Sequence, residues 1–239
     1  TFESGGASAT VTAARCIRIK IGTNATSGVT GAEQISNGVA ANAHSVAVGG
    51  TFGDSGTAAI DIIADDSVNI TATVDPTISF AITDVAVGFG TLSSSQATWA
   101  NSGATGTTSQ PATSAGAHEM TVATNAASGY TITYNGATLT NGLNTISVAT
   151  ITGDADGTPA SEQFAIAIDD NGGNVTIPSA YDYASNNYSF VAGTTTTLAS
   201  ETIATATETI DVQYIANVAT TTEAGAYSTD VTYIATGNF

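Results

Sequence analysis

The chain has 239 residues, of which 20 are Asp or Glu and only three are Lys or Arg, so its formal net charge is −17. This balance excludes a nucleic-acid-binding face, which needs Lys and Arg spread over a surface, and it disfavours binding to an anionic membrane. No apolar run approaches the roughly 20 residues of a transmembrane helix, so we expect no membrane insertion. With 42% hydrophobic and 10% charged residues, the chain lacks the composition of a disordered protein.

All three positive charges fall within six residues near the N-terminus, at Arg15, Arg18 and Lys20. The stretch from Gly5 to Ile21 is predicted as one long strand, because its side chains alternate in character. Arg15 interrupts the apolar face, so it must reach an acid, lie at a rim or mark a bulge. The residues on that face are Val11, Ala13, Arg15, Ile17, Ile19 and Ile21.

The strand is followed by a segment rich in Gly, Asn, Ala and Ser. We therefore divide the chain into a terminal strand over residues 1–22, a flexible linker over 23–56 and a β-rich body over 57–239. The only cysteine, Cys16, excludes an internal disulfide framework but leaves an intermolecular bridge open.

Alternating apolar residues and turn signals predict about ten short strands in the body, and no helical periodicity is evident. The fold class expected is all-β, a β-sandwich or jelly roll. Residues 93–117, which contain the only Trp, are expected to form a loop. The predicted strands are 58–63, 68–74, 77–82, 85–92, 118–124, 130–134, 144–151, 163–168, 174–178, 188–192, 210–217 and 227–234.

The terminal strand has features that favour exchange between subunits. It lies before a tether, it has an apolar face, and its charge is opposite to that of residues 21–239, which hold 19 acids and no Lys or Arg. An extended segment can complete the sheet of another subunit. Four apolar side chains on it would contribute on the order of 10 kcal/mol before ordering costs. The alternative is that the strand pairs within its own chain. The expected interface residues are Val11, Ala13, Arg15, Ile17, Arg18, Ile19, Lys20 and Ile21.

With its terminal strand (residues 9–21), linker, all-β body and closing strand (225–236), the chain resembles prokaryotic fibre subunits completed by a donor strand. These include chaperone–usher pilins, archaeal threads and bundling pili, and TasA-like fibres. The chain lacks the paired cysteines of chaperone–usher pilins and the hydrophobic N-terminal helix of type IV pilins. The resemblance implies a homopolymer of identical subunits in which the N-terminal strand is exchanged.

Other chemistry has weaker signals. The chain has no P-loop, dinucleotide fingerprint or nucleophile elbow, so we expect no enzyme. Asp154 and Asp156 resemble the start of a calcium-binding loop that lacks its bidentate Glu, which leaves Ca²⁺ as the one candidate cofactor. Candidate glycosylation sequons begin at Asn24, Asn69, Asn174 and Asn187.

These observations favour a secreted structural protein of a cell-surface filament that polymerises head to tail. Two alternatives stay open. The first is a monomeric carbohydrate-binding adhesin module, for which surface glycans would be the partners. The second is a surface-layer lattice protein, which would form two-dimensional sheets and depend on calcium.

Overall fold

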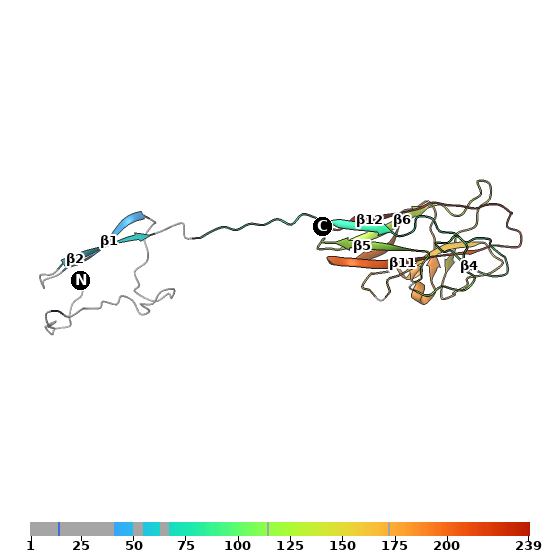
Figure 1. The fold of residues 1–239 in the computed structure, drawn as a ribbon, viewed down its shortest axis with the longest axis horizontal. Helices are drawn as coiled ribbons and strands as arrows, with labels where there is room; N and C mark the ends of the chain where they lie inside the picture. The colour runs from blue at the N-terminus through green and yellow to red at the C-terminus, as the bar shows by residue number, and fades with distance from the viewer. Residues whose placement is uncertain (1–13, 15–40, 50–54, 63–66, 114, 172) are drawn as a thin grey trace. The chain divides into compact units, whose positions relative to one another are not determined.

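A computed structural model describes residues 14, 41–49, 55–62, 67–113, 115–171 and 173–239. Within them the protein is nearly all β, with twelve strands and two short 3-10 helices (Figure 1), which confirms the all-β fold class. The chain divides into two compact units, Thr1–Ala72 and Thr73–Phe239. Among the described residues, no helix has the length and hydropathy that a membrane span requires.

The first unit contains an antiparallel hairpin of β1 (Ala41–Gly49) and β2 (Ser55–Ile62). Alternating residues such as Val46, Val48 and Ile60 remain about half exposed in it. β1 lies inside the expected linker, and the expected boundary at residue 56 falls within β2. β1 and β2 pair with each other and with no other strand of the described residues, and the two compact units divide at Ala72.

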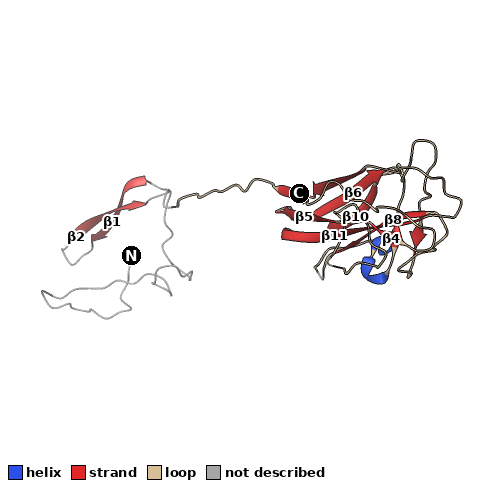
Figure 2. Cartoon of the chain, turned by 45° about the vertical axis from the view of Figure 1, so that its right-hand side comes forward, coloured by secondary structure: helices blue, strands red, loops and turns tan. Residues whose placement is uncertain are grey.

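The second unit contains two antiparallel sheets. The larger has the strand order β3-β5-β11-β8-β9-β7, with β4 paired to β11, and the smaller has the order β10-β6-β12. Figure 2 shows the two 3-10 helices, η1 (Ser179–Tyr181) and η2 (Tyr183–Ser185), beside the larger sheet. The strands are β3 (Ile78–Ile82), β4 (Thr98–Trp99), β5 (His118–Thr124), β6 (Tyr130–Gly136), β7 (Thr150–Ile151), β8 (Gln163–Asp169), β9 (Tyr188–Ser189), β10 (Thr196–Glu201), β11 (Thr205–Asn217) and β12 (Val231–Gly237).

The main core lies between the two sheets, since it combines buried side chains from both. β6 contributes Tyr130 and Ile132, and β8 and β11 contribute Ile166 and Val212, all fully buried. A second cluster, on the other face of the larger sheet, is built around Trp99. The indole Nε1 of Trp99 donates to the hydroxyl of Tyr188 at 3.1 Å, which satisfies its one polar group.

Several predicted strands are confirmed, and β5 matches its predicted bounds of 118–124. The strands at 77–82, 130–134, 163–168, 210–217 and 227–234 correspond to β3, β6, β8, β11 and β12, and 58–63 corresponds to β2. The predictions at 144–151 and 188–192 shorten to two residues each, in β7 and β9. The predictions at 68–74, 85–92 and 174–178 are wrong, and β4 and β10 have no predicted counterpart.

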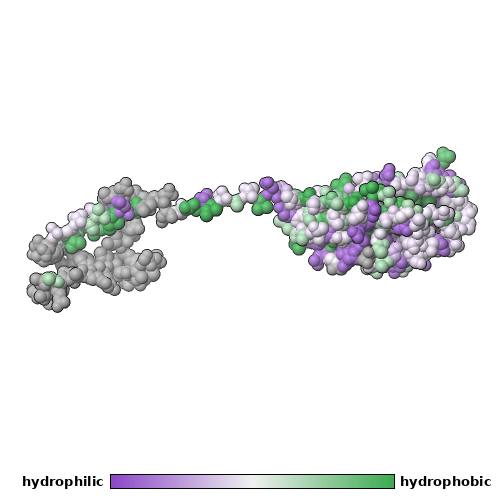
Figure 3. All heavy atoms as spheres, in the orientation of Figure 1, coloured by the Kyte–Doolittle hydropathy of each residue, from purple (hydrophilic) through white to green (hydrophobic). Residues whose placement is uncertain are grey.

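The segment of residues 67–77 shows why alternation alone is insufficient. Val68, Ile70 and Val74 are more than four-fifths exposed, and the apolar side chains alternate with polar ones along it (Figure 3). No strand of the described residues pairs with it. Its end is fixed where Asn125 accepts from the backbone N–H of Thr77 at 2.8 Å and donates to the carbonyl of Asp75 at 2.8 Å.

Candidate functional site: an open groove between two sheet edges

Each sheet of the second unit ends in an unpaired edge on the same side. β3 pairs only with β5 and β12 pairs only with β6 among the described residues, and the two edge strands lie close to each other. The pairing of β12 with its neighbour extends back to Ser228, whose N–H and C=O each bond Thr140 at 3.0 Å. Residues 227–237 therefore have hydrogen-bonding partners along one edge and an open edge on the other side.

The core is incomplete along this open edge. Burial alternates from Tyr227 to Gly237, with odd positions half-buried and even positions exposed. A strand of a closed sandwich would bury those odd positions fully. Most of the apolar residues that pack against the main core while staying only partly buried come from this side, namely Phe80, Ile82, Val87, Phe89, Leu92, Val218, Tyr227, Val231, Tyr233 and Ala235.

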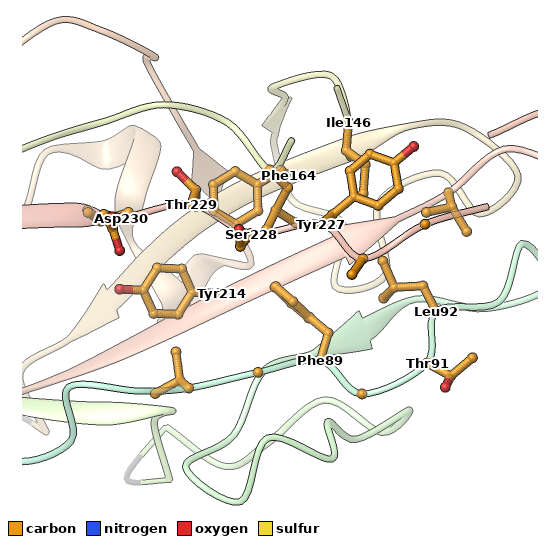
Figure 4. Close-up of a pocket in the computed structure, with 18 of the residues that line it drawn as sticks. Phe89, Thr91, Leu92, Ile146, Phe164, Tyr214, Tyr227, Ser228, Thr229 and Asp230 are labelled. Atoms are coloured by element: carbon orange, nitrogen blue, oxygen red, sulfur yellow. The ribbon is translucent and has the colours of Figure 1, made fainter. Parts of the chain in front are cut away.

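The gap between the edges is a groove of about 990 Å³. One wall is the chain that follows β3, including Phe89 and Leu92, and the other is the chain that leads into β12, including Tyr227 (Figure 4). Phe164 and Tyr214 form its floor, with rings stacked at 6.3 Å between centroids. Phe89 meets Phe164 edge to face at 6.4 Å. The groove is thus lined by aromatic side chains on its floor and on both walls.

The wall that contains Phe89 is held in place by close backbone packing. Gly88 and Asn101 exchange two backbone hydrogen bonds of 3.0 Å. Gly106 has a φ of 65°, and a Cβ there would meet the carbonyl oxygen of Phe89 at 2.2 Å, so only glycine fits. The opposite wall is held in place by a hydrogen bond in which the hydroxyl of Thr229 donates to the carbonyl of Ala137 at 2.6 Å. Both walls are therefore positioned by contacts within the unit itself.

One end of the groove is polar. His118 Nε2 lies 3.0 Å from the hydroxyl of Tyr214, and that hydroxyl lies 2.5 Å from the hydroxyl of Tyr233. His118 is only 4% exposed, and its Nδ1 has no hydrogen-bond partner among the described residues. Burial lowers the pKa of His118, while the backbone of Glu119 and the charge of Asp84 oppose that shift. Burial thus favours the neutral form of the ring, although the charge of Asp84 acts against it.

This lowered pKa gives a prediction for stability. The unfolded chain binds a proton at His118 near pH 6.5, whereas the folded chain resists it, so the stabilising contribution exists above that pH and is lost as the pH falls. Unfolding measured from pH 8 to pH 5 is expected to show this loss in the native chain and not in His118→Gln. Equal pH dependence in the two proteins would contradict this.

The groove is acidic. Asp84, Glu223 and Asp230 line it, and the described residues contain no Lys or Arg that could pair with them. Since the whole chain has no Lys or Arg after Lys20, only the terminal segment could supply a matching cation from the same sequence. The site is suited to an extended, apolar segment that has positive charge.

The expected interface residues Val11, Ala13, Arg15, Ile17, Arg18, Ile19, Lys20 and Ile21 all lie outside the described residues, as does Asn24. Ala14 is described, and it forms an exposed turn with a φ of 70°. The predicted strand from Gly5 to Ile21 is therefore interrupted at Ala14. The left-handed conformation costs a residue with a Cβ roughly 1–2 kcal/mol, and an extended conformation at Ala14 would release that cost.

The described sequon asparagines differ in exposure. Asn69 and Asn174 are exposed. Asn187 is half-buried, with its Nδ2 donating to the carbonyl of Ser179 and its Oδ1 accepting from Gly153, both at 2.8 Å, so it is the least available sequon of the three.

Asp154 and Asp156 lie in one exposed turn, where Asp154 Oδ1 accepts from the backbone N–H of Asp156 at 3.2 Å. In the described part of the chain, no group of three or more His, Cys, Asp or Glu is arranged to hold a metal ion. A Ca²⁺ ion at this turn stays a prediction from the sequence.

The groove is not visible in the sequence. Its polar end joins His118 to Tyr214 and Tyr233, which are 96 and 115 positions away along the chain. No local motif links them. The regular alternation of residues 227–234 marks one exposed and one inward face, but it cannot show that one edge lacks a neighbour. Comparison of the chain with protein-family models, with curated proteins and with solved structures finds no match in any of the three.

Proposed function

We propose that this protein is the structural subunit of an extracellular filament. In this proposal the second unit is a β-sandwich that lacks one edge strand, and residues 10–21 of a neighbouring subunit fill the groove between β3 and β12. The observation that supports the proposal most is the open groove, with unpaired backbone at its rim and partly buried core residues along its length.

The burial of apolar surface favours insertion of a strand into the groove. The groove exposes Phe89, Leu92 and Tyr227 to solvent in part, and apolar area removed from water is worth roughly 25 cal/mol per Å². An inserted strand would bury them together with its own isoleucines, and would pair with backbone groups on the open edge of β12. Exposed edges of this kind are otherwise sites of uncontrolled association.

The charges favour a second copy of this chain as the partner. Residues 21–239 hold 19 acids and no Lys or Arg, so these parts of two subunits repel each other. The basic terminal segment of one subunit is instead attracted to the acidic groove of the next. A contact between unlike surfaces that does not close on itself produces a linear polymer. The resemblance to donor-strand fibre subunits, the sequons and the scarcity of charge agree with a secreted, cell-surface location.

The experiment compares the full chain with a chain lacking residues 1–21. Electron microscopy and size-exclusion chromatography are expected to show filaments for the full chain and monomers for the truncated one. Filaments should also resist SDS without heating, because the exchanged strand is held by a full set of strand hydrogen bonds.

Filaments that persist after the deletion would remove the proposal. A full chain that stays monomeric, with residues 10–21 in its own groove, would show that the strand closes its own sheet. That outcome would favour the carbohydrate-binding alternative, which glycan binding by the monomeric full chain would then test.

A further inference from the structure

The groove has a direction, because its two ends differ in chemistry. Phe89, Leu92 and Tyr227 make one end apolar (Figure 4). His118, Asp84 and the hydroxyl of Tyr233 make the other end polar. The terminal segment has the same asymmetry on its predicted inward face, where Arg15 is followed by three isoleucines at 17, 19 and 21. The alignment inferred from this match rests on the proposed function.

From this match we infer that residues 15–21 of one subunit lie antiparallel to residues 227–233 of the next, with Arg15 opposite Tyr233 and Ile21 opposite Tyr227. Directly opposite residues of an antiparallel pair share a face. Odd positions face inward over 227–233 and are predicted to do so over 15–21, so in this alignment the isoleucines enter the apolar end and the Arg15 guanidinium meets the polar end.

The outward face supplies an independent match. The same alignment places Arg18 directly opposite Asp230, which is exposed just before β12 and has no Lys or Arg near it among the described residues. Opposite charges at directly facing positions stabilise a strand pair. Shifting the strand by two residues in either direction moves Arg15 away from Tyr233. In one direction the shift puts Lys20 in place of Arg18 opposite Asp230, so it is Arg15 that separates these two registers. A parallel strand with Arg15 opposite Tyr233 puts Arg18 opposite Thr236, which is not an acid.

Arg15 thereby has a role in specificity. A guanidinium has five N–H donors and no acceptor. The polar end offers the Asp84 carboxylate and the two tyrosine hydroxyls as acceptors. The next inward residue, Ala13, is small, which suits the place where β12 and β3 lie close together. Arg15 is thus the residue that fixes register.

Cys16, the only cysteine, makes the alignment testable, because it falls opposite the exposed Thr232. Full-length Thr232→Cys is assembled under reducing conditions and then oxidised, with Ile234→Cys and Ser228→Cys as matched outward-facing controls. Disulfides need Cβ atoms roughly 3.5–4.5 Å apart, so only the directly opposite pair is well placed. We expect Thr232→Cys to form a ladder of covalent oligomers roughly tenfold faster than either control.

The outcomes separate the alignment from the function. Filaments that need residues 1–21 but cross-link best at Ile234 or Ser228, or equally at all three positions, would overturn the alignment and leave the function standing. Filaments that do not need residues 1–21 would overturn both. A disulfide within single chains would place the strand in its own groove and overturn the exchange.

A charge swap covers the case in which a cysteine variant fails to assemble. Arg18→Asp and Asp230→Arg are each expected to slow assembly roughly two- to fivefold at low salt, and the double variant is expected to recover the native rate. A double variant that is as slow as the singles would contradict the pairing of Arg18 with Asp230.

Discussion

Phe164→Ala is expected to lower the free energy of unfolding by about 3–5 kcal/mol, the largest effect of any single substitution considered. Phe164 is only 2% exposed and lies beneath the groove. Its ring contacts Phe89, Phe190 and Tyr214, with Phe190 at 4.9 Å between centroids. Removing it leaves a cavity under the floor and takes away the support of one wall.

Denaturant unfolding of the truncated chain, which lacks residues 1–21, measures this effect without interference from assembly. Phe239→Ala is the control, because that ring is 65% exposed and its loss should change stability little. A loss below about 1 kcal/mol for Phe164→Ala would show that the floor is not part of the rigid core.

Adding a peptide of residues 8–22 to the truncated chain is expected to stabilise it strongly. A ligand that binds only the folded state raises stability by about 2.7 kcal/mol when it is present at 100 times its dissociation constant. For a unit of this size that corresponds to a rise in Tm of roughly 5–10 °C. Thermal unfolding with increasing peptide concentration measures it.

The control peptide has the same composition but exchanges Ile17 with Cys16 and Ile19 with Arg18. This change moves two isoleucines to the outward face while keeping length and charge. It should raise Tm much less than the native peptide. Equal effects of the two peptides would indicate attraction by charge alone and would remove the apolar groove as the binding site.

The sequence predicts strands well where alternation and turns coincide. His118–Thr124 is predictable because its buried positions alternate strictly. Thr196–Glu201 is not, because the register shifts between Thr197 and Ala199, so Leu198 and Ala199 are both buried and the period of two is broken. Residues 85–92 have a strand composition, but Gly90 adopts a φ of 65° and the chain turns to form the groove wall.

Of the two surfaces in the proposed contact, only the terminal segment is predictable from the sequence. Composition and charge identify residues 10–21 as a segment suited to an acidic, apolar partner, but the partner surface is made by tertiary structure. Whether β12 has a second neighbour depends on the order of strands in a sheet, which no local pattern in residues 227–237 encodes. The polar end has the same origin, since His118 reaches Tyr214 only through the pairing of β5 with β11.

The turn at Ala14 has a consequence for the free energy of the proposed strand exchange. A φ of 70° costs a residue with a Cβ roughly 1–2 kcal/mol relative to an extended conformation, so a terminal segment that extends at Ala14 when it pairs releases this strain. A release of that size favours the paired segment over the free one by up to about thirtyfold. Part of the driving force for pairing would then come from the free terminal segment itself and not from the surface that receives it.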